Sequence, residues 1–337
     1  MNRFDYIRPN TVAAAISALT SPTARVLAGG TNLVDLMKYD IEQPGSLVDI
    51  NRLPLKEISA TEDGGLRIGA LVSNSDLAWN EAVQARYPLL ASAILAGASP
   101  QLRNAATTGG NLLQRTRCYY FYDPSTACNK REPGTGCSAI GGVNRIHAIL
   151  GASDDCIAVH PSDMCVALAA IGASVEVEGP DGKRSILFSG FHRLPGAEPH
   201  RDNTMSAGGL ITGIVLPPTD FGNNHTYLKI RDRLSYAFAL ISVAVGLTLK
   251  ADKIEDARVA LGGVAHKPWR DEPAEEMLKG EKADTSLFSR FADTVLAPAK
   301  GQGANDFKID LARRAIVRAL HQAAAGTPQD QSNKSVQ

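Results

Sequence analysis

The stretch LAGGTNLVD, residues 27–35, is the most informative local pattern in the sequence, and TTGGNLL at 107–113 repeats it. Each stretch places two adjacent glycines between small hydroxyl or amide residues. Glycine lets the backbone approach a ligand closely, and adjacent N–H groups can bind an anion. A helix expected to begin at Thr31 would add a partial positive charge. Each pair therefore predicts either a pyrophosphate-binding loop or a simple tight turn.

Other nucleotide-binding signatures are missing from the sequence. No GxGxxG follows an expected strand, and no GxxxxGK[ST] occurs, so neither a Rossmann site nor a P-loop is predicted. A nucleotide cofactor would need another scaffold.

Four cysteines lie in a segment without sustained periodicity, at about 114–159. Cys118, Cys128, Cys137 and Cys156 are separated by 9, 8 and 18 residues. Four thiolates can hold a zinc ion or an iron–sulfur cube. Zinc sites favour pairs two to four residues apart, which are absent here, so the wide gaps favour the larger cluster. Unpaired cysteines in a long loop are the remaining alternative.

The composition bounds the class of protein. Five cysteines in 337 residues do not indicate a disulfide scaffold, and Cys165, in an apolar helix, is expected to be a small buried hydrophobic residue.

Lys and Arg balance Asp and Glu at 35 each, so the charge gives no reason to expect a nucleic acid partner. The N-terminus reads as an amphipathic helix and not as a secretory signal. We expect no membrane insertion, because the longest apolar run, 236–249, is too short and predicts a buried helix.

The local patterns predict alternating helices and strands. Ser75 is the expected cap of one helix, and Tyr236, Leu240 and Val243 are expected to be core. A domain boundary is expected near Gly222. Helices are predicted at 11–19, 31–40, 75–83, 88–98, 163–171, 272–279, 284–296 and 310–324. A strand that ends in a glycine turn is predicted at 25–31, two strands joined at 63–65 within 55–71, a hairpin at 173–186, and further strands at 46–50 and 209–218.

Several segments together resemble a known family. LAGGTNLVDLMK, LRIGALVSNSDL, RNAATTGGNLL, HPSDM and YLKIRDRLSYAFALISVAVGLTL resemble, in order and spacing, the FAD-binding subunits of the xanthine oxidase family of molybdenum hydroxylases. The resemblance extends from Phe4 to about Leu320. The cysteine segment is similar to the [4Fe–4S]-binding insertion of two groups, the bacterial periplasmic aldehyde oxidoreductases and 4-hydroxybenzoyl-CoA reductase. NLLQRTRC, CNKR and ALGGVAHKPWR favour the first group.

The resemblance implies an α+β fold. A two-part FAD-binding domain of the vanillyl-alcohol-oxidase (PCMH) type is expected at 1–222, with the iron–sulfur insertion inside it. A smaller α+β domain, like the C-terminal domain of CO dehydrogenase flavoproteins, is expected at 223–326, followed by a flexible tail at 327–337.

The resemblance also implies cofactor-binding residues but no catalytic residue. The first glycine segment would hold the FAD pyrophosphate, the second would form another FAD turn, and Lys229 would lie near the isoalloxazine or else be an exposed lysine on a strand edge. His160 reads as structural, and His266 and Trp269 as part of the domain contact. The implied FAD residues are Leu27, Ala28, Gly29, Gly30, Thr31, Asn32, Leu33, Gly97, Ala98, Thr107, Thr108, Gly109, Gly110, Asn111, Leu113, Ser162, Asp163 and Lys229, and the implied [4Fe–4S] ligands are Cys118, Cys128, Cys137 and Cys156.

The implied function is electron transfer within a heterotrimer. Substrate would be oxidised at a molybdenum cofactor on a large subunit, and electrons would cross [2Fe–2S] centres on a small subunit. FAD on this chain would pass them to an external acceptor other than NAD, and the [4Fe–4S] cluster would be either a relay or a structural staple. The complex would reach the periplasm through a signal on the small subunit; without it the chain would stay cytoplasmic.

Other functions stay open at this point. The complex could be similar to 4-hydroxybenzoyl-CoA reductase or xanthine dehydrogenase. A stand-alone FAD oxidase would need a histidine or carboxylate constellation that the sequence does not show. A zinc-bound scaffold without redox activity is the remaining alternative.

Overall fold

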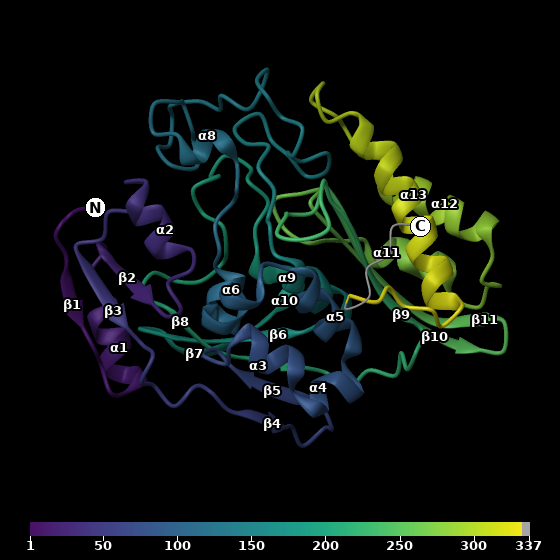
Figure 1. The fold of residues 1–337 in the computed structure, drawn as a ribbon, viewed down its shortest axis with the longest axis horizontal. Helices are drawn as coiled ribbons and strands as arrows, with labels where there is room; N and C mark the ends of the chain where they lie inside the picture. Colours follow the sequence, from purple (N-terminus) through teal and green to yellow (C-terminus); the bar gives the residue numbers. More distant parts are fainter. Residues whose placement is uncertain (332–337) are drawn as a thin grey trace.

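The computed structural model describes residues 1–331 and contains three sheets (Figure 1). The central sheet is antiparallel, with strand order β4-β5-β8-β6-β7. Because β5 pairs with β8, segments nearly 150 residues apart in sequence lie side by side. Its strands are β4 (Ile58–Ala60), β5 (Leu66–Gly69), β6 (Ser174–Gly179), β7 (Gly182–Leu187) and β8 (Leu210–Leu216).

A small parallel sheet forms the N-terminal end of the molecule. Its order is β1-β3-β2, and Thr11 caps its helix α1 by accepting a hydrogen bond from the Ala14 N–H. Ala15 and Val48 are completely buried and pack with Leu71 and Leu210, which joins this sheet to the central one. The elements are β1 (Asp5–Ile7), α1 (Val12–Ala18), β2 (Ala24–Leu27), α2 (Leu33–Lys38) and β3 (Ser46–Asp49).

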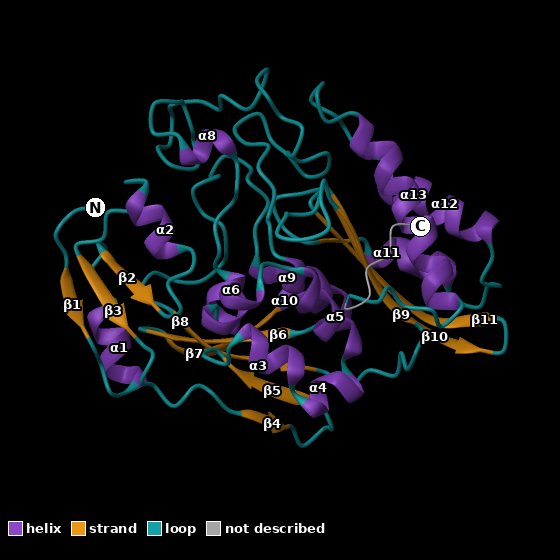
Figure 2. Cartoon of the chain, viewed as in Figure 1, coloured by secondary structure: helices purple, strands orange, loops and turns teal. Residues whose placement is uncertain are grey.

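Short helices cover the central sheet (Figure 2). Every residue of α9 is buried, because its alanines allow close packing between the central sheet and the C-terminal sheet. Arg258 and Arg270 donate to carbonyls near the C-terminal end of α9. These helices are α3 (Asn74–Trp79), α4 (Glu81–Arg86), α5 (Pro88–Ala96), α6 (Pro100–Ala105), α7 (Thr108–Leu112), α9 (Asp163–Ile171) and α10 (Phe188–Phe191).

The C-terminal sheet is antiparallel, with order β12-β11-β10-β9. Helix α13 packs on β9 and β10, and α12 packs on α13, around a second core that includes Phe288, Phe291 and Ile316. The elements are β9 (His225–Ile230), β10 (Ile241–Lys250), β11 (Lys253–Gly262), β12 (Trp269–Arg270), α11 (Glu272–Glu275), the 3-10 helix η1 (Glu276–Leu278), α12 (Thr285–Leu296) and α13 (Phe307–Ala324).

The prediction of a buried helix at 236–249 is wrong. Residues 241–250 form strand β10, which packs against α9 on one face and α13 on the other. With both faces buried, the strand loses the alternation of apolar and polar residues that identifies a half-buried strand. Tyr236 is also not core, since its side chain is 56% exposed, whereas Leu240 and Val243 are buried as expected.

Two predicted helix caps are displaced. Asn32 and not Thr31 precedes α2, and Ser73 and not Ser75 caps α3 by accepting from the Asp76 N–H. Residues 327–331, assigned to a flexible tail, are held against β9: the Gln329 N–H donates to Thr226, and the Gln331 side chain donates to the Tyr227 carbonyl. The rest of that predicted tail lies outside the described residues. Within residues 1–331, no helix combines the length and apolar character needed to cross a bilayer.

The segment at 114–159 is almost entirely loop, as the sequence predicts. Its one helix is α8 (Tyr119–Tyr122), a single turn (Figure 2). The C-terminal domain holds the far end of the segment, because the N–H groups of Ile149 and Leu150 both donate to the Val264 carbonyl. The loop conformation therefore depends on contacts with other parts of the chain.

Candidate functional site

A cavity of about 950 Å³ lies between the N-terminal sheet, the central sheet and the loop before β10. This volume is at the upper end of the range for ligand pockets, roughly 300–1,000 Å³. Both glycine segments line it. All the predicted FAD residues line this large cavity except Leu27, whose side chain lies behind Gly30, and Thr108, which is fully buried and donates to the Val72 carbonyl.

The first glycine segment has little space for side chains. A Cβ on Gly29 would lie 1.9 Å from the Ala105 carbonyl oxygen, and Gly30 has a φ of 71°. The Asn32 side-chain oxygen accepts from the Arg115 backbone N–H at 2.9 Å, while the side-chain amide nitrogen of Asn32 is buried without a partner. A buried donor of this kind fits an anionic or carbonyl group of a ligand.

The second glycine segment is the first turn of a short helix, α7, and not a free turn. Thr107 caps α7 by accepting from the Gly110 N–H at 3.3 Å. Next to it, the Ser162 hydroxyl donates to the Asn111 side-chain oxygen at 2.5 Å. This bond joins the glycine segment to the start of α9, so the two predicted parts of the site form one wall.

The cavity is positively charged. Six Arg or Lys side chains line it against three carboxylates. Arg103 has no carboxylate within 4 Å in the described chain, and burial lowers its pKa. Such a lining suits an anionic ligand such as a pyrophosphate.

The alternative that Lys229 is an exposed lysine on a strand edge is wrong. Its side chain is 2% accessible, and its ammonium lies 2.8 Å from the Asp163 carboxylate. Its position near the isoalloxazine stays a prediction. Asp163 also accepts from the Tyr227 hydroxyl at 2.7 Å. A Cβ on Gly97 would come within 2.9 Å of Asp163, so a larger residue there would push against this pair.

Two residues of the cavity wall have strained backbones. Ala98 and Tyr236 have φ values of 50° and 51°, a region that side chains other than glycine seldom adopt. Asp40 and Ala251 share this feature elsewhere. The surrounding structure must hold the backbone in place at these positions, and strain of this kind is common at ligand sites of proteins.

A second, smaller cavity lies on the other side of residues 115–118. All four predicted ligands, Cys118, Cys128, Cys137 and Cys156, line it, together with Phe121, Lys130 and Ala158. We call this cavity the cysteine chamber. All five cysteines are free thiols, and Cys165 lies apart in the core as predicted.

The spacing of the sulfurs is too wide for one zinc ion. Among residues 1–331, the single group of three His, Cys or acidic side chains whose ligand atoms lie within 4.8 Å of one another is His160, Cys165 and His192. Zn–S bonds of about 2.3 Å would bring tetrahedral sulfur ligands to about 3.8 Å. The sulfur spacing therefore favours a larger inorganic group over one zinc ion, and the chamber, which has about 10 Å³ of free space, would have to widen around such a group.

The chemistry of the chamber also favours a bound cation. Burial raises the pKa of Cys118 to about 12 and that of Cys156 to about 11. Metal binding deprotonates such thiols and compensates their charge. His147 contacts Cys118, with Nε2 3.1 Å from Sγ, and burial, together with the Lys308 charge, lowers the pKa of His147 to about 4.

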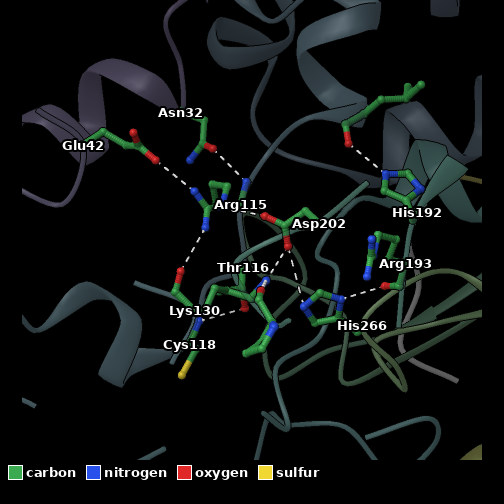
Figure 3. Close-up of polar contacts among 12 residues, drawn as sticks. Asn32, Glu42, Arg115, Thr116, Cys118, Lys130, His192, Arg193, Asp202 and His266 are labelled. Atoms are coloured by element: carbon green, nitrogen blue, oxygen red, sulfur yellow. Dashed lines mark hydrogen bonds and ion pairs between the residues drawn. The ribbon is translucent and has the colours of Figure 1, made fainter. Parts of the chain in front are cut away.

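A buried ionic network joins the two cavities (Figure 3). Asp202 contacts Arg115 at 2.7 Å and also Lys130, and Arg115 reaches Glu42 at 2.9 Å. Burial alone would raise the pKa of Asp202, but the charges of Lys130 and Arg115 outweigh it and hold the pKa well below its usual range. Arg115 lines the large cavity and Lys130 lines the chamber, so Asp202 ties their walls together.

The predicted structural residues lie close to this network. His266 is buried, its Nδ1 lies 2.8 Å from the Arg193 carbonyl, and its Nε2 lies 3.6 Å from Asp202. Trp269 is partly buried in the C-terminal core. The rings of His160 and His192 pack at 4.4 Å, and burial lowers both pKa values. The structural role of His160 stays a prediction.

Sequence reasoning missed several residues of the large cavity. Arg103, Arg233 and Phe238 line it, as does a third diglycine pair, Gly208 and Gly209. This pair is one of six diglycine pairs in the sequence, and it is followed by Leu210 and not by a hydroxyl or amide residue, so the pattern of the first two segments does not single it out. Arg103 and the loop at 233–238 carry no such signal, because their position depends on how the chain folds back.

Comparison with known proteins identifies the family. Residues 2–219 match the family described as FAD binding domain in molybdopterin dehydrogenase, and residues 225–323 match the CO dehydrogenase flavoprotein C-terminal domain. The aldehyde oxidoreductase FAD-binding subunit PaoB of Escherichia coli K12 is 52% identical over 96% of this chain and 99% of its own length. The chain belongs to the FAD-binding subunits of the molybdenum hydroxylase family.

Other members of the molybdenum hydroxylase family are more distant. The glyceraldehyde dehydrogenase medium chain of Sulfolobus acidocaldarius is 27% identical over 95% of this chain and 98% of its own. A solved carbon monoxide dehydrogenase of Hydrogenophaga pseudoflava aligns with a TM-score of 0.76 and 27% identity, over 96% of this chain and 98% of that one. The predicted family, α+β fold class, FAD cofactor and role as an oxidoreductase subunit are confirmed.

Proposed function

We propose that the chain is the FAD- and [4Fe–4S]-binding electron-transfer subunit of a heterotrimeric aldehyde oxidoreductase that contains molybdenum. The observation that carries this proposal is the pair of adjoining cavities, one lined by diglycine segments and one by four cysteines. The identity of 52% to an aldehyde oxidoreductase subunit supports aldehydes as the substrate class. The partners would be a large subunit with the molybdenum cofactor and a small subunit with [2Fe–2S] centres.

In this function, residues of the large cavity would bind FAD and stabilise its reduced form. Bound FAD would accept single electrons from clusters and deliver one or two to an external acceptor. The Asn32 amide and the Arg103 guanidinium would bind its anionic part, since both carry buried N–H groups without partners. Lys229, held by Asp163, would keep a positive charge in the cavity wall and favour an anionic reduced flavin.

The chamber residues would hold the cluster and exclude water. Four cysteines supply the thiolates, and the apolar side chains of Leu36, Phe121 and Ile157 surround them. Lys130 lies inside the protein with its side chain 1% exposed and would offset part of the negative charge of the cluster. The N–H of Ala158, 3.5 Å from the Cys156 sulfur, would donate to that ligand.

Anaerobic purification with and without the two partner subunits tests the proposal. We expect one FAD and about four irons on this chain, and aldehyde oxidation with a dye acceptor only when all three subunits are present. Aldehyde turnover by the isolated chain would contradict the subunit role. Flavin without iron in the anaerobic chain would contradict the cluster.

A further inference from the structure

We propose that His147 donates an N–H···S hydrogen bond to the cluster ligand Cys118 and thereby raises the reduction potential of the [4Fe–4S] cluster. The inference rests on the proposed function, because it requires that the four cysteines hold this cluster. His147 is a tuning residue outside the ligand set, and neither spacing nor any motif singles it out.

The geometry of His147 fits a single role. Its Nε2 lies 3.1 Å from the Cys118 sulfur, and the two side chains belong to residues that are 1% and 7% exposed. A metal-bound thiolate carries no proton and can only accept, so Nε2 must carry the hydrogen. Nδ1 is buried without a partner in the described chain, which leaves the contact with sulfur as the one polar interaction of the ring.

The C-terminal domain fixes this histidine from behind. The Lys308 ammonium donates to the His147 carbonyl at 2.8 Å and to the Gly263 carbonyl at 2.5 Å. The Asn305 amide donates to the carbonyls of His147 and Ala148 at 3.1 and 3.0 Å. The backbone of His147 therefore has little freedom, and its ring is held against the sulfur.

Lys308 adds a second electrostatic contribution. It is completely buried, and no carboxylate lies within 4 Å of its ammonium in residues 1–331. Because an unpaired buried cation is costly, burial lowers the pKa of Lys308 to about 7, and a nearby anion would reduce this cost. A cluster held by the four cysteines would lie beyond His147, and a charged Lys308 would stabilise its more negative, reduced state.

The direction of the effect follows from charge. One electron, supplied by a reductant, adds one negative charge to the iron and sulfur atoms of the cluster. A hydrogen bond to a ligand sulfur is stronger when that sulfur is more negative, and hydrogen bonds to sulfur are one of the factors that set cluster potentials. A dry, apolar chamber strengthens such a bond. Removal of the donor should therefore make reduction harder.

Redox titration of the intact complex tests the proposal. Dithionite and mediators are used, with the cluster followed by EPR and the flavin by absorption. We expect His147→Phe to shift the cluster midpoint to a more negative potential and leave the FAD midpoint unchanged. His147→Gln, which keeps an N–H donor, should restore most of the shift, and Lys308→Met should give a smaller negative shift.

The control is His225→Phe, because His225 is also buried but lines neither cavity and contacts the Gly222 carbonyl. A wild-type cluster potential in iron-replete His147→Phe would overturn the inference. If that variant loses iron, wild-type protein labelled with ¹⁵N-histidine decides by pulsed EPR: coupling of one histidine nitrogen to the reduced cluster supports the bond, and its absence overturns it. Wild-type protein without any iron would instead refute the proposed function.

Discussion

The large cavity and the cysteine chamber share the wall at residues 115–118 but differ in what holds their linings in place. The large cavity is lined by ends of regular elements: the residues after β2, helix α7, and the first turn of α9. The chamber is lined by a long segment with a single helical turn, α8. Its conformation depends on side-chain bonds such as those of Lys130, Asn305 and Lys308.

This difference indicates how far the conformation of each cavity depends on its bound cofactor. Regular elements with their own cores, such as the cluster around Val48, keep their shape without a ligand. The long loop at 114–159 has only a small apolar cluster of its own, around Phe121 and Ile157, so we expect that ordering it needs compensation from a bound group. We therefore expect the FAD site to be preformed and the chamber to fold with its cluster.

Loss of one cluster ligand should have the largest effect. Cys128→Ser should remove nearly all iron and expose segment 114–159 to proteases, because binding energy and folding energy of a structural metal site are the same quantity. FAD should stay bound, since the large cavity has its own framework. Iron analysis, flavin analysis and limited proteolysis measure the three effects.

Cys165→Ala is the control for the ligand variant. Cys165 is buried in α9 outside the chamber, so this variant should keep its iron. Loss of FAD together with iron would contradict two independently held cavities. Among cluster-free proteins that keep FAD, full aldehyde turnover in the complex would exclude an electron relay and favour a structural staple.

A side chain added to the first diglycine should weaken FAD binding in the large cavity. Gly29→Ala would place a Cβ 1.9 Å from the Ala105 carbonyl oxygen, so the first glycine segment and the end of α6 must move apart. We expect FAD affinity to fall about tenfold or more, which is about 1.4 kcal/mol, with iron content unchanged. Flavin fluorescence titration measures it. Gly190→Ala, where no atom lies within 4 Å of the new Cβ, should bind FAD normally; equal loss in both variants would point to a general folding defect.

The sequence predicts the residues that line the two cavities better than it predicts the contacts that position them. The diglycine pairs and the cysteine spacing are local patterns, so the chain shows them before it folds. The fold class and most element positions also follow from local patterns. Strand β10 was predicted as a helix because burial on both faces removes the periodicity that local reasoning uses.

Contacts between residues far apart in the sequence are not predicted by any local pattern. Asp202 lies 72 residues from Lys130, and Lys308 lies 161 residues from His147. The first pair depends on how the stretch between α10 and β8 lies against the loop segment, and the second depends on the packing of the C-terminal domain against it. Tyr236 shows the same limit, since an aromatic residue beside an apolar run reads as core until the loop places it at the cavity.

The shared wall can be tested through Asp202. Asp202→Asn leaves Lys130 buried without its ion partner, which costs about 3–5 kcal/mol for a broken buried pair. We expect a lower melting temperature and partial loss of both cofactors, because Arg115 and Lys130 contact opposite cavities. Glu198→Gln is a control, since Glu198 pairs with Arg193 and Arg201 and is itself 44% exposed.

The pH dependence has a definite sign. Lys130 and Arg115 hold the pKa of Asp202 below its unfolded value, which is about 3.9. The carboxylate therefore stabilises the folded state fully above about pH 5, and this contribution is lost as pH falls through the folded pKa. Thermal unfolding of the wild type and Asp202→Asn should differ most above pH 5 and converge in acid. A constant difference down to the lowest pH would contradict the ionic role.

Relief of backbone strain should give the smallest effect. Ala98 has a φ of 50°, and strain of this kind costs about 1–3 kcal/mol, while a glycine loses about 0.5–1 kcal/mol through its greater freedom in the unfolded chain. Ala98→Gly should therefore stabilise the protein by about 1 kcal/mol and raise the melting temperature by about 2–4 °C. It should also weaken FAD binding a few-fold, because a more mobile backbone at the cavity must be ordered when the ligand binds.

Ala251→Gly separates the two effects of that change. Ala251 has a φ of 56° in the turn between β10 and β11 and lines neither cavity. It should show the same gain in melting temperature with unchanged FAD affinity. If both variants bind FAD equally well, the strain at Ala98 has no part in holding the cofactor. If only Ala98→Gly binds more weakly, the large cavity is preformed partly at the expense of stability, whereas the cysteine chamber gains its order from its cluster.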